Sequence, residues 1–332
     1  MAIDVDSLIA LALEKNFPIE KLINSVENYV TESYAAWPDA LPQGRAVLNR
    51  ETGEILVHVP QYDENGVYTH SITHMPEGFE RTIDRTVKKA LKDQFRASKD
   101  LQIVAEVSTS VGDVISGIVQ QGRDPEVIYV NIGIAEAIVP ATEQVPTEHY
   151  KHGDRIKAFV VKAERGMKGP EIILSRTHPL LVRALFALEV PEIKDRIVDV
   201  VGVAREPGSR SKISVRSHRA GVSAKGALIG PGGARTKAVT DELHGEKIDI
   251  VDWSEDLAQY VANALAPAKV SSAEVVDAES KSVKVIVPDY QLSLAIGKDG
   301  QNARLAARLT GARIDIHPDN PVRRITGVEE SL

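Results

Sequence analysis

The stretch LAIGKDGQNARLAARLTG, residues 294–311, decides how the rest of the chain is interpreted. Gly297 and Gly300 flank two residues, and an amphipathic segment containing Arg304 and Arg308 follows, which predicts a helix that begins just after a tight glycine turn. Such a loop can present backbone N–H groups to a phosphate. The nucleoside-triphosphate P-loop does not fit, because it needs four residues between its glycines and a Lys-Ser/Thr after the second. A plain helix-entry turn remains the alternative.

A second copy of this stretch lies earlier in the chain. LIGPGGARTKAVTDELHGEKIDIV, residues 228–251, aligns with AIGKDGQNARLAARLTGARIDIH, residues 295–317. Glycines, helix pattern, helix-ending glycine and an alternating KIDI or RIDI strand recur in the same order. Two strand-like runs precede each copy, so we predict the order β-β-α-α-β twice, with a helix at SEDLAQYVANALA, residues 254–266, joining the repeats.

This duplicated pattern resembles the K-homology (KH) domain in its strands-first, prokaryotic variant. The resemblance implies that each Gly-x-x-Gly loop clamps about four single-stranded nucleotides. Glycines allow the sugar-phosphate chain to approach the backbone, the following helix offers N–H groups, and Lys237 or Arg304 adds a charge one turn on. One such loop is weak evidence, whereas two in matching frames are strong.

The charge distribution supports a polyanion partner. The net charge is −7, yet residues 1–80 hold 13 acids against 4 bases, and residues 151–240 hold 18 bases against 8 acids. Residues 205–237 contain eight bases and only one acid, Glu206. A merely solvated charged face is the alternative. The RNA-binding candidates are Gly230, Pro231, Gly232, Gly233, Arg235, Lys237, Gly297, Lys298, Asp299, Gly300, Gln301, Asn302, Arg304, Arg176, Arg205, Arg210, Lys212 and Arg216.

Short, glycine-punctuated strands between about residues 108 and 178 predict a five-stranded barrel of the OB class. The order resembles the ribosomal S-one RNA-binding motif. Exposed aromatics for base stacking are few, Tyr129 and Tyr150, because Phe159 is predicted to be in the core. We therefore expect RNA backbone contacts from basic residues, namely Lys157, Arg165, Lys168 and Arg176.

The first hundred residues form a different, acidic unit. Two helices broken at Phe17-Pro18 are predicted from apolar spacing that includes Leu8 and Leu11, followed by a hairpin at RAVLNRETGEILVHVP and a long amphipathic helix at EGFERTIDRTVKKALKDQFRASKD. No catalytic constellation is recognisable here. A protein-docking module is predicted, with a structural cap as the alternative.

Composition bounds the remaining possibilities. The chain has 332 residues, 43% hydrophobic and 26% charged, which suits two or three domains. It has no cysteine, an acidic start and no apolar run of about 18 residues, so we expect a soluble cytoplasmic protein without disulfides. His70 and His74 lack a convincing third metal ligand, and Glu242 and Asp249 are expected to be solvated. No cofactor, metal or enzymatic activity is expected.

The whole chain resembles the NusA family of bacterial transcription elongation, termination and antitermination factors. The stretches that carry the resemblance are LEKNFPIEKLINSVENYV, LSRTHP, LEVPEIKD, VAREPGSRSKISVRS, DELHGEKIDIVDWSED and LAIGKDGQNARLAARLTG. It implies an α+β multidomain fold: an RNA polymerase-binding domain at 1–104, an OB-fold RNA-binding barrel at 105–180, and KH domains at 181–268 and 269–332. The implied partners are the RNA polymerase core, nascent single-stranded RNA and other antitermination factors, with no membrane and a monomeric state.

One departure from the family concerns the first loop. The family usually has Gly-Pro-basic-Gly, whereas this chain has Gly230-Pro231-Gly232-Gly233, so only the second loop, with Lys298, keeps a charge at its tip. We expect the second loop to bind phosphate more firmly. An RNA-degrading phosphorylase would need a large catalytic core for which the chain has no room. A general RNA-binding protein of translation or decay remains the alternative function.

Overall fold

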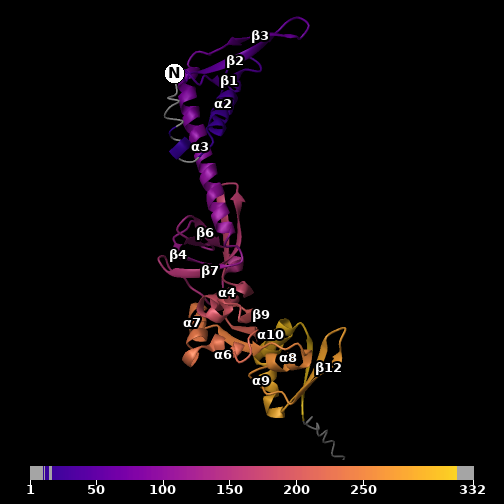
Figure 1. The fold of residues 1–332 in the computed structure, drawn as a ribbon. Helices are drawn as coiled ribbons and strands as arrows, with labels where there is room; N and C mark the ends of the chain where they lie inside the picture. The colour runs from indigo at the N-terminus through magenta and orange to yellow at the C-terminus, as the bar shows by residue number, and fades with distance from the viewer. Residues whose placement is uncertain (1–9, 11, 15–16, 320–332) are drawn as a thin grey trace, which may run out of the picture. The chain divides into compact units, whose positions relative to one another are not determined.

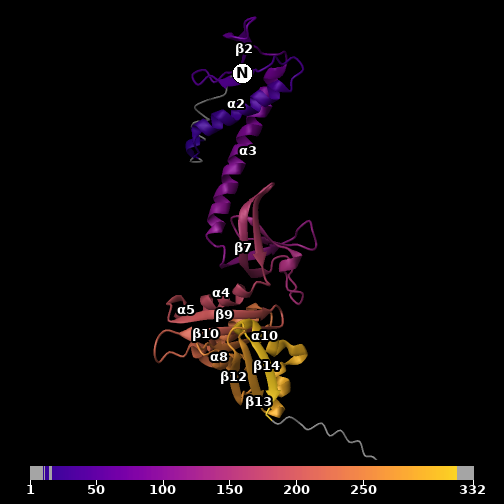
Figure 2. The same cartoon turned by 90° about the vertical axis from the view of Figure 1, so that its right-hand side faces the viewer.

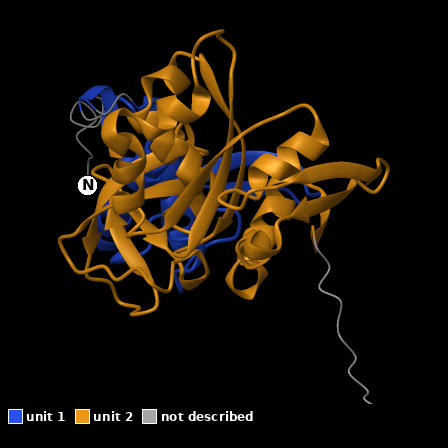
Figure 3. Cartoon of the chain, turned by 90° about the horizontal axis from the view of Figure 1, so that it is seen from below, with its two compact units in different colours: residues 1–103, 167–169 blue, residues 104–166, 170–332 orange. Residues whose placement is uncertain are grey.

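The computed structural model describes residues 10, 12–14 and 17–319. The chain divides into two compact units, residues 1–103 with 167–169, and residues 104–166 with 170–332 (Figure 3). Most of the first predicted helix, including Leu8 and Leu11, lies outside the described residues. In the part of the chain that is described, no helix combines the length and the apolar character needed to cross a membrane.

The first unit consists of helices packed on a small sheet (Figure 1). Its elements in chain order are α2 (Ile19–Ala35), β1 (Arg45–Leu48), β2 (Ile55–Tyr62), β3 (Tyr68–Thr73) and α3 (Phe79–Ser108). Pro18 immediately precedes α2, and β1 pairs antiparallel with β2, which confirms the predicted helix break and hairpin. The core joins Val30 and Tyr34 of α2 to Val57 of β2 and Phe79 of α3.

The predicted barrel is confirmed as a closed sheet of five strands in the order β4-β5-β6-β8-β7. Its strands are β4 (Val114–Gln120), β5 (Ile128–Asn131), β6 (Glu136–Val139), β7 (Arg155–Gly166) and β8 (Gly169–Ser175). Alternate apolar side chains such as Val130, Ala158 and Leu174 are fully buried, as the period of a strand requires. Phe159 is buried and stacks on His178 with ring centroids 4.1 Å apart, so its predicted place in the core is confirmed.

The two repeats are α-β-β-α-α-β units. The first contains α4 (Pro179–Glu189), α5 (Pro191–Lys194), β9 (Val198–Glu206), β10 (Arg210–Ser217), α6 (Ala224–Ile229), α7 (Ala234–Glu242) and β11 (Lys247–Asp252). The second contains α8 (Leu257–Ala264), β12 (Ser272–Asp277), β13 (Ser282–Val287), α9 (Leu292–Ile296), α10 (Gln301–Thr310) and β14 (Arg313–Pro318). In each sheet the middle strand pairs antiparallel with the first strand and parallel with the last (Figure 2).

The first helix of each repeat corrects the predicted order. The segment PLLVRALFALE of α4 is apolar on most sides, so its sequence shows little periodicity, and we did not predict a helix there. Leu181, Leu185 and Phe186 of this helix are buried in the core of the first repeat. Helix α8, predicted to join the repeats, packs Tyr260 and Val261 into the core of the second repeat.

Candidate nucleic-acid interface

The two Gly-x-x-Gly loops have nearly the same backbone conformation. Gly230 has φ 71° and ψ 175°, and Gly297 has φ 79° and ψ 169°. In each loop the last glycine N–H donates to the carbonyl of the first glycine, at 3.1 Å for Gly233 and 3.2 Å for Gly300. The third loop position is left-handed in both, with φ 59° at Gly232 and φ 53° at Asp299. The sequence repeat therefore encodes one loop geometry twice.

Both loops open directly onto helices without a side-chain cap. Gly233 precedes α7 and Gly300 precedes α10, each in the left-handed region, and neither helix has a side chain bonded to its first-turn N–H groups. The backbone N–H groups in the first turn of an α-helix have no carbonyl acceptor within that helix. They are suited to an anion such as a phosphate, in keeping with the positive end of the helix dipole.

The charged side chains nearest the loops differ in availability. Lys298 is exposed, and its side chain has no hydrogen bond or ion pair to any described residue. Lys237 is exposed and forms an ion pair with Asp241 one turn further along α7, at 2.7 Å. Arg304 is half-exposed, donates from Nε to Glu206 at 2.7 Å, and donates from Nη1 to the carbonyl of Asp299 at 3.0 Å. A phosphate at the second loop would meet Lys298 without displacing a partner.

A groove of about 570 Å³ lies beside the first loop. Helices α6 and α7 form one side, and β11 forms the floor. The lining residues are Lys225, Ile229, Gly233, Thr236, Lys237, Thr240, Ile248, Asp249, Ile250, Ala266 and Pro267. Its lining combines apolar side chains with the two bases Lys225 and Lys237, which suits a nucleotide, whose base is flat and whose backbone is anionic. Of these residues, the sequence predicted only Gly233 and Lys237 as RNA contacts.

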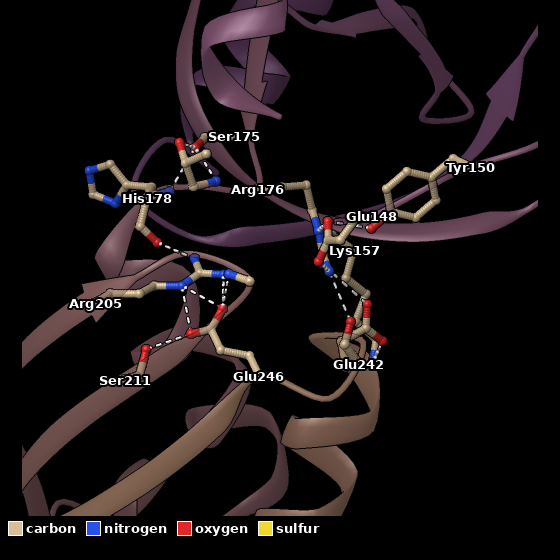
Figure 4. A network of polar contacts seen from close by, with 12 residues as sticks. Glu148, Tyr150, Lys157, Ser175, Arg176, His178, Arg205, Ser211, Glu242 and Glu246 are labelled. Atoms are coloured by element: carbon tan, nitrogen blue, oxygen red, sulfur yellow. Dashed lines mark hydrogen bonds and ion pairs between the residues drawn. The ribbon is translucent and has the colours of Figure 1, made fainter. Parts of the chain in front are cut away.

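Two predicted RNA contacts are instead buried at the boundary of the barrel and the first repeat, and the prediction for them is wrong. Arg176 is 1% exposed and donates to both carboxylate oxygens of Glu148, from Nε at 2.8 Å and from Nη2 at 2.5 Å (Figure 4). Arg205 is buried and forms a bidentate pair with Glu246. The signal was misleading because a basic residue looks the same in a sequence whether it serves a phosphate or a buried carboxylate.

Glu242 also belongs to this boundary, which corrects its predicted solvation. It lies 3.3 Å from Lys157 and 3.5 Å from Arg176, and its backbone carbonyl accepts a bond from Arg176 at 2.9 Å (Figure 4). Tyr150 donates to Glu148 at 2.8 Å, and burial, more than the neighbouring carboxylates, raises the pKa of its hydroxyl. The barrel and the first repeat thus share a dense polar contact.

Lys212 and Arg210 are also withdrawn from the surface. Lys212 is fully buried, and both side chains donate to Asp249, Lys212 at 2.9 Å and Arg210 at 2.7 Å. Burial opposes ionisation of Asp249, but its two cationic partners outweigh burial and hold its pKa below the usual range. The predicted solvation of Asp249 is therefore wrong, and Lys212 is not placed to contact RNA directly.

Arg235 and Asn302 occupy equivalent positions and both tie down the helix before the loop. Arg235 donates to the carbonyl of Ala227 at 2.7 Å and to Glu192 at 2.9 Å. Asn302 is buried and donates to the carbonyls of Ala295 and Leu265 at 3.0 and 2.9 Å. These contacts fix the loop and leave Asn302 with no surface for RNA.

The two repeats meet directly behind the second loop. Glu206, the single acid of the basic stretch, accepts bonds from Gln301 at 2.8 Å and Arg304 at 2.7 Å. The bond from Arg304 contributes most to a Glu206 pKa below its ordinary value. Gln301 also donates to Ser209 at 2.8 Å. The first repeat thereby holds the start of α10.

The other predicted basic residues remain accessible. Arg216 is half-exposed, with its guanidinium 4.8 Å from the Trp253 ring and 3.5 Å from Asp199. On the barrel, Arg165 and Lys168 are exposed, whereas Lys157 is partly buried in its pair with Glu242.

In the first unit, Nδ1 of His74 lies 2.7 Å from the Tyr34 hydroxyl. No cluster of three metal-ligating side chains occurs among the residues described.

The fold and the loops define a multidomain protein with an OB-type barrel and two tandem KH domains. Family models agree: the NusA-like first KH domain matches residues 176–253, and the NusA-like second KH domain matches residues 257–323, which includes α8.

The chain belongs to the NusA family. It is 45% identical to the transcription termination/antitermination protein NusA of Mycobacterium tuberculosis strain H37Rv over 97% of this chain and 94% of the relative. It is 42% identical to the protein of that name from Bacillus subtilis strain 168, over 97% of this chain and 92% of the relative.

Proposed function

We propose that this protein is a transcription factor that binds RNA polymerase through residues 1–104 and nascent single-stranded RNA through the barrel, residues 105–180, and through the two KH domains, of which the second begins at α8. Through these contacts it modulates pausing, termination and antitermination. The similar relatives are named as termination/antitermination proteins, and no catalytic step is proposed. We expect it to act as a monomer in the cytoplasm, together with other antitermination factors.

The observation that carries the RNA part of this proposal is the matched geometry of the two loops. Each loop combines a first glycine near ψ 170°, two left-handed positions and an uncapped helix start. A backbone in this conformation can approach a sugar-phosphate chain closely and offer it N–H groups. The contacting residues that we propose are the loop residues, Lys237, Gln301 and Arg304 in the helices that follow the loops, and Arg216 of β10.

Photo-crosslinking in a paused elongation complex tests both parts of the proposal. Photoreactive groups placed in residues 19–73 should crosslink to polymerase subunits, and groups placed beside residues 230–233 and 297–300 should crosslink to the nascent RNA. Polymerase crosslinks that are absent while RNA crosslinks persist would favour the alternative function, a general RNA-binding protein of translation or decay. RNA crosslinks that are absent at both loops would contradict the RNA-binding surface.

A further inference from the structure

We propose that the second KH domain forms one wall of the nucleotide groove of the first, and that Lys212 is the positioning residue that holds this wall in place. The inference rests on the proposed RNA binding. It assigns a role in that binding to residues outside the loops: Ala266 and Pro267 of the second KH domain and Lys212 of the first.

The wall is visible in the lining of the groove beside residues 230–233. Nine of the lining residues come from α6, the loop, α7 and β11 of the first domain, whereas Ala266 and Pro267 follow α8 of the second. Leu265, immediately before them, is fully buried in the core of the second domain. The wall is therefore fixed to the second domain and faces the groove of the first.

Lys212 links the wall to the floor of the groove. Its Nζ donates to the carbonyl of Ala266 at 2.7 Å and to Asp249 on β11 at 2.9 Å. A buried ammonium is costly unless it is paired and hydrogen-bonded, so these two acceptors are what allow the charge to remain inside. Burial lowers the pKa of Lys212 below its ordinary value, and Asp249 opposes that shift.

The second repeat provides an internal comparison. Lys212 lies opposite Asp249 in the β10–β11 pair, and Lys284 lies opposite Asp315 at the same place in the β13–β14 pair. Lys284 and Asp315 are both exposed, and Asp315 pairs with His317 instead. The same lysine and aspartate in the same register are thus withdrawn from solvent, Lys212 fully and Asp249 partly, only in the domain where the lysine bonds to the 266–267 segment. Burial of Lys212 is a property of the junction between the domains and not of the KH repeat itself.

A nucleotide in the first groove would therefore touch both domains. Ala266 and Pro267 line the groove together with residues of the first domain, so the first clamp depends on the second domain being in place. This arrangement also compensates for a first loop without a charged tip, because part of the binding energy comes from contact with the wall and not from loop electrostatics.

Enlarging the wall tests the proposal without altering the first domain. In the full chain, Ala266→Leu should fill part of the groove, and Ala262→Leu, one turn earlier on α8 and equally half-buried but outside the groove, is the matched control. The probe is a fluorescein-labelled single-stranded RNA pool of about 12 random nucleotides, long enough for two clamps. We expect Ala266→Leu to weaken binding about tenfold and Ala262→Leu to leave it unchanged.

Hydrogen exchange locates the effect within the chain. Bound RNA should slow exchange in segments 230–237 and 297–304 of the unaltered protein. With Ala266→Leu, protection of 230–237 should be lost while that of 297–304 persists. Lys212→Met should weaken protection of 230–237 and speed exchange around residues 265–268, whereas Lys284→Met should do neither. If Lys212→Met fails to fold, the Ala266→Leu comparison decides the question.

Two outcomes separate this proposal from the proposed function. If Ala266→Leu binds and protects like Ala262→Leu while Gly230→Val weakens protection at 230–237, the wall is overturned and the RNA clamp stands. If RNA protects neither loop of the unaltered protein, RNA binding through the clamps fails, and the wall fails with it.

Discussion

The two KH domains have Gly-x-x-Gly loops of the same conformation but differ in the residues that surround these loops. Both loops place a glycine in a conformation that only glycine adopts readily, and both have a left-handed third position. In the first domain that position is Gly232, whereas in the second it is Asp299, a residue type that tolerates the left-handed region better than most. The comparison teaches that the flanking glycines set the loop, and that the residues between them are free to set its charge.

The domains also differ in their cores. Strand pairing places Arg205 opposite Ser211 in the first domain and Val275 opposite Val283 at the same place in the second. Glu246, just before β11, binds Arg205 and Ser211, whereas Ala312 precedes β14. Arg205, Ser211 and Glu246 form a buried polar set. Within it, Arg205 also donates to the carbonyl of His178 at the start of α4 (Figure 4). The first domain thus uses buried ion pairs where it adjoins the barrel, and the second uses apolar packing.

Breaking this polar set should produce the largest effect. Glu246→Ala leaves the buried Arg205 guanidinium unpaired, and we expect it to lower the free energy of unfolding by about 3–5 kcal/mol. The triple change Arg205→Val, Ser211→Val and Glu246→Ala copies the second domain and should recover part of that loss. Urea denaturation of the full chain measures both. A triple variant no more stable than Glu246→Ala would contradict the equivalence of the two cores.

The first glycines of the loops should respond unequally to alanine. A Cβ on Gly297 would lie 2.8 Å from the backbone nitrogen of Asn302, whereas on Gly230 its nearest neighbours, from 2.7 Å, would be side-chain atoms of Arg235, which can move more readily than backbone. Both positions carry a backbone strain of about 1–3 kcal/mol for a residue other than glycine. We expect Gly297→Ala to reduce RNA affinity and thermal stability more than Gly230→Ala. Equal losses would mean that strain alone decides and the Asn302 contact is irrelevant.

Acid should release the contact between the domains. Because Arg304 holds the folded pKa of Glu206 below its ordinary value, the stabilisation is fully present above the ordinary glutamate pKa and is lost as pH falls through the folded pKa. At pH 7 the unaltered protein should be more stable than Glu206→Gln. This difference in stability should vanish once the pH lies below the folded pKa of Glu206. Denaturation curves at several pH values test this. A difference that stays constant with pH would exclude a role for the Glu206 charge.

The smallest expected effect concerns the tip of the second loop. The side chain of Lys298 has no partner among the described residues, so Lys298→Ala should not change the stability of the fold. If Lys298 neutralises one phosphate, its removal should reduce the slope of log K against log salt by about 0.7. Pro231→Ala, at the same place in the uncharged first loop, is the control and should leave the slope unchanged. Identical slopes for the two variants would remove Lys298 from the binding site.

Most elements of the fold could be predicted from the sequence because local residue patterns determine where helices, strands and turns begin and end. The loop glycines, the strand alternation of KIDI and RIDI and the proline before α2 are local signals, and the structure has the expected element at each. Helix α4 escaped prediction because its apolar residues lack a clear period.

The candidate site was predicted less completely, because ion pairing is a long-range property. Arg176 and Glu148 are 28 residues apart, and Arg205 and Glu246 are 41 apart. No local pattern indicates that such bases are buried. The wall at Ala266 and Pro267 gave no signal either, because these residues lie outside the duplicated stretch and carry no charge.

A salt titration of RNA binding with both loops altered tests the central claim most directly. The full chain and its Gly230→Val, Gly297→Val double variant are compared with the random RNA pool by fluorescence anisotropy. We predict that log K of the unaltered chain falls linearly with log salt, by about 0.7 for each phosphate contacted, and that the double variant binds at least about tenfold more weakly while its barrel remains folded. A double variant that binds RNA as tightly as the unaltered chain, with the same salt slope, would contradict the two-loop clamp.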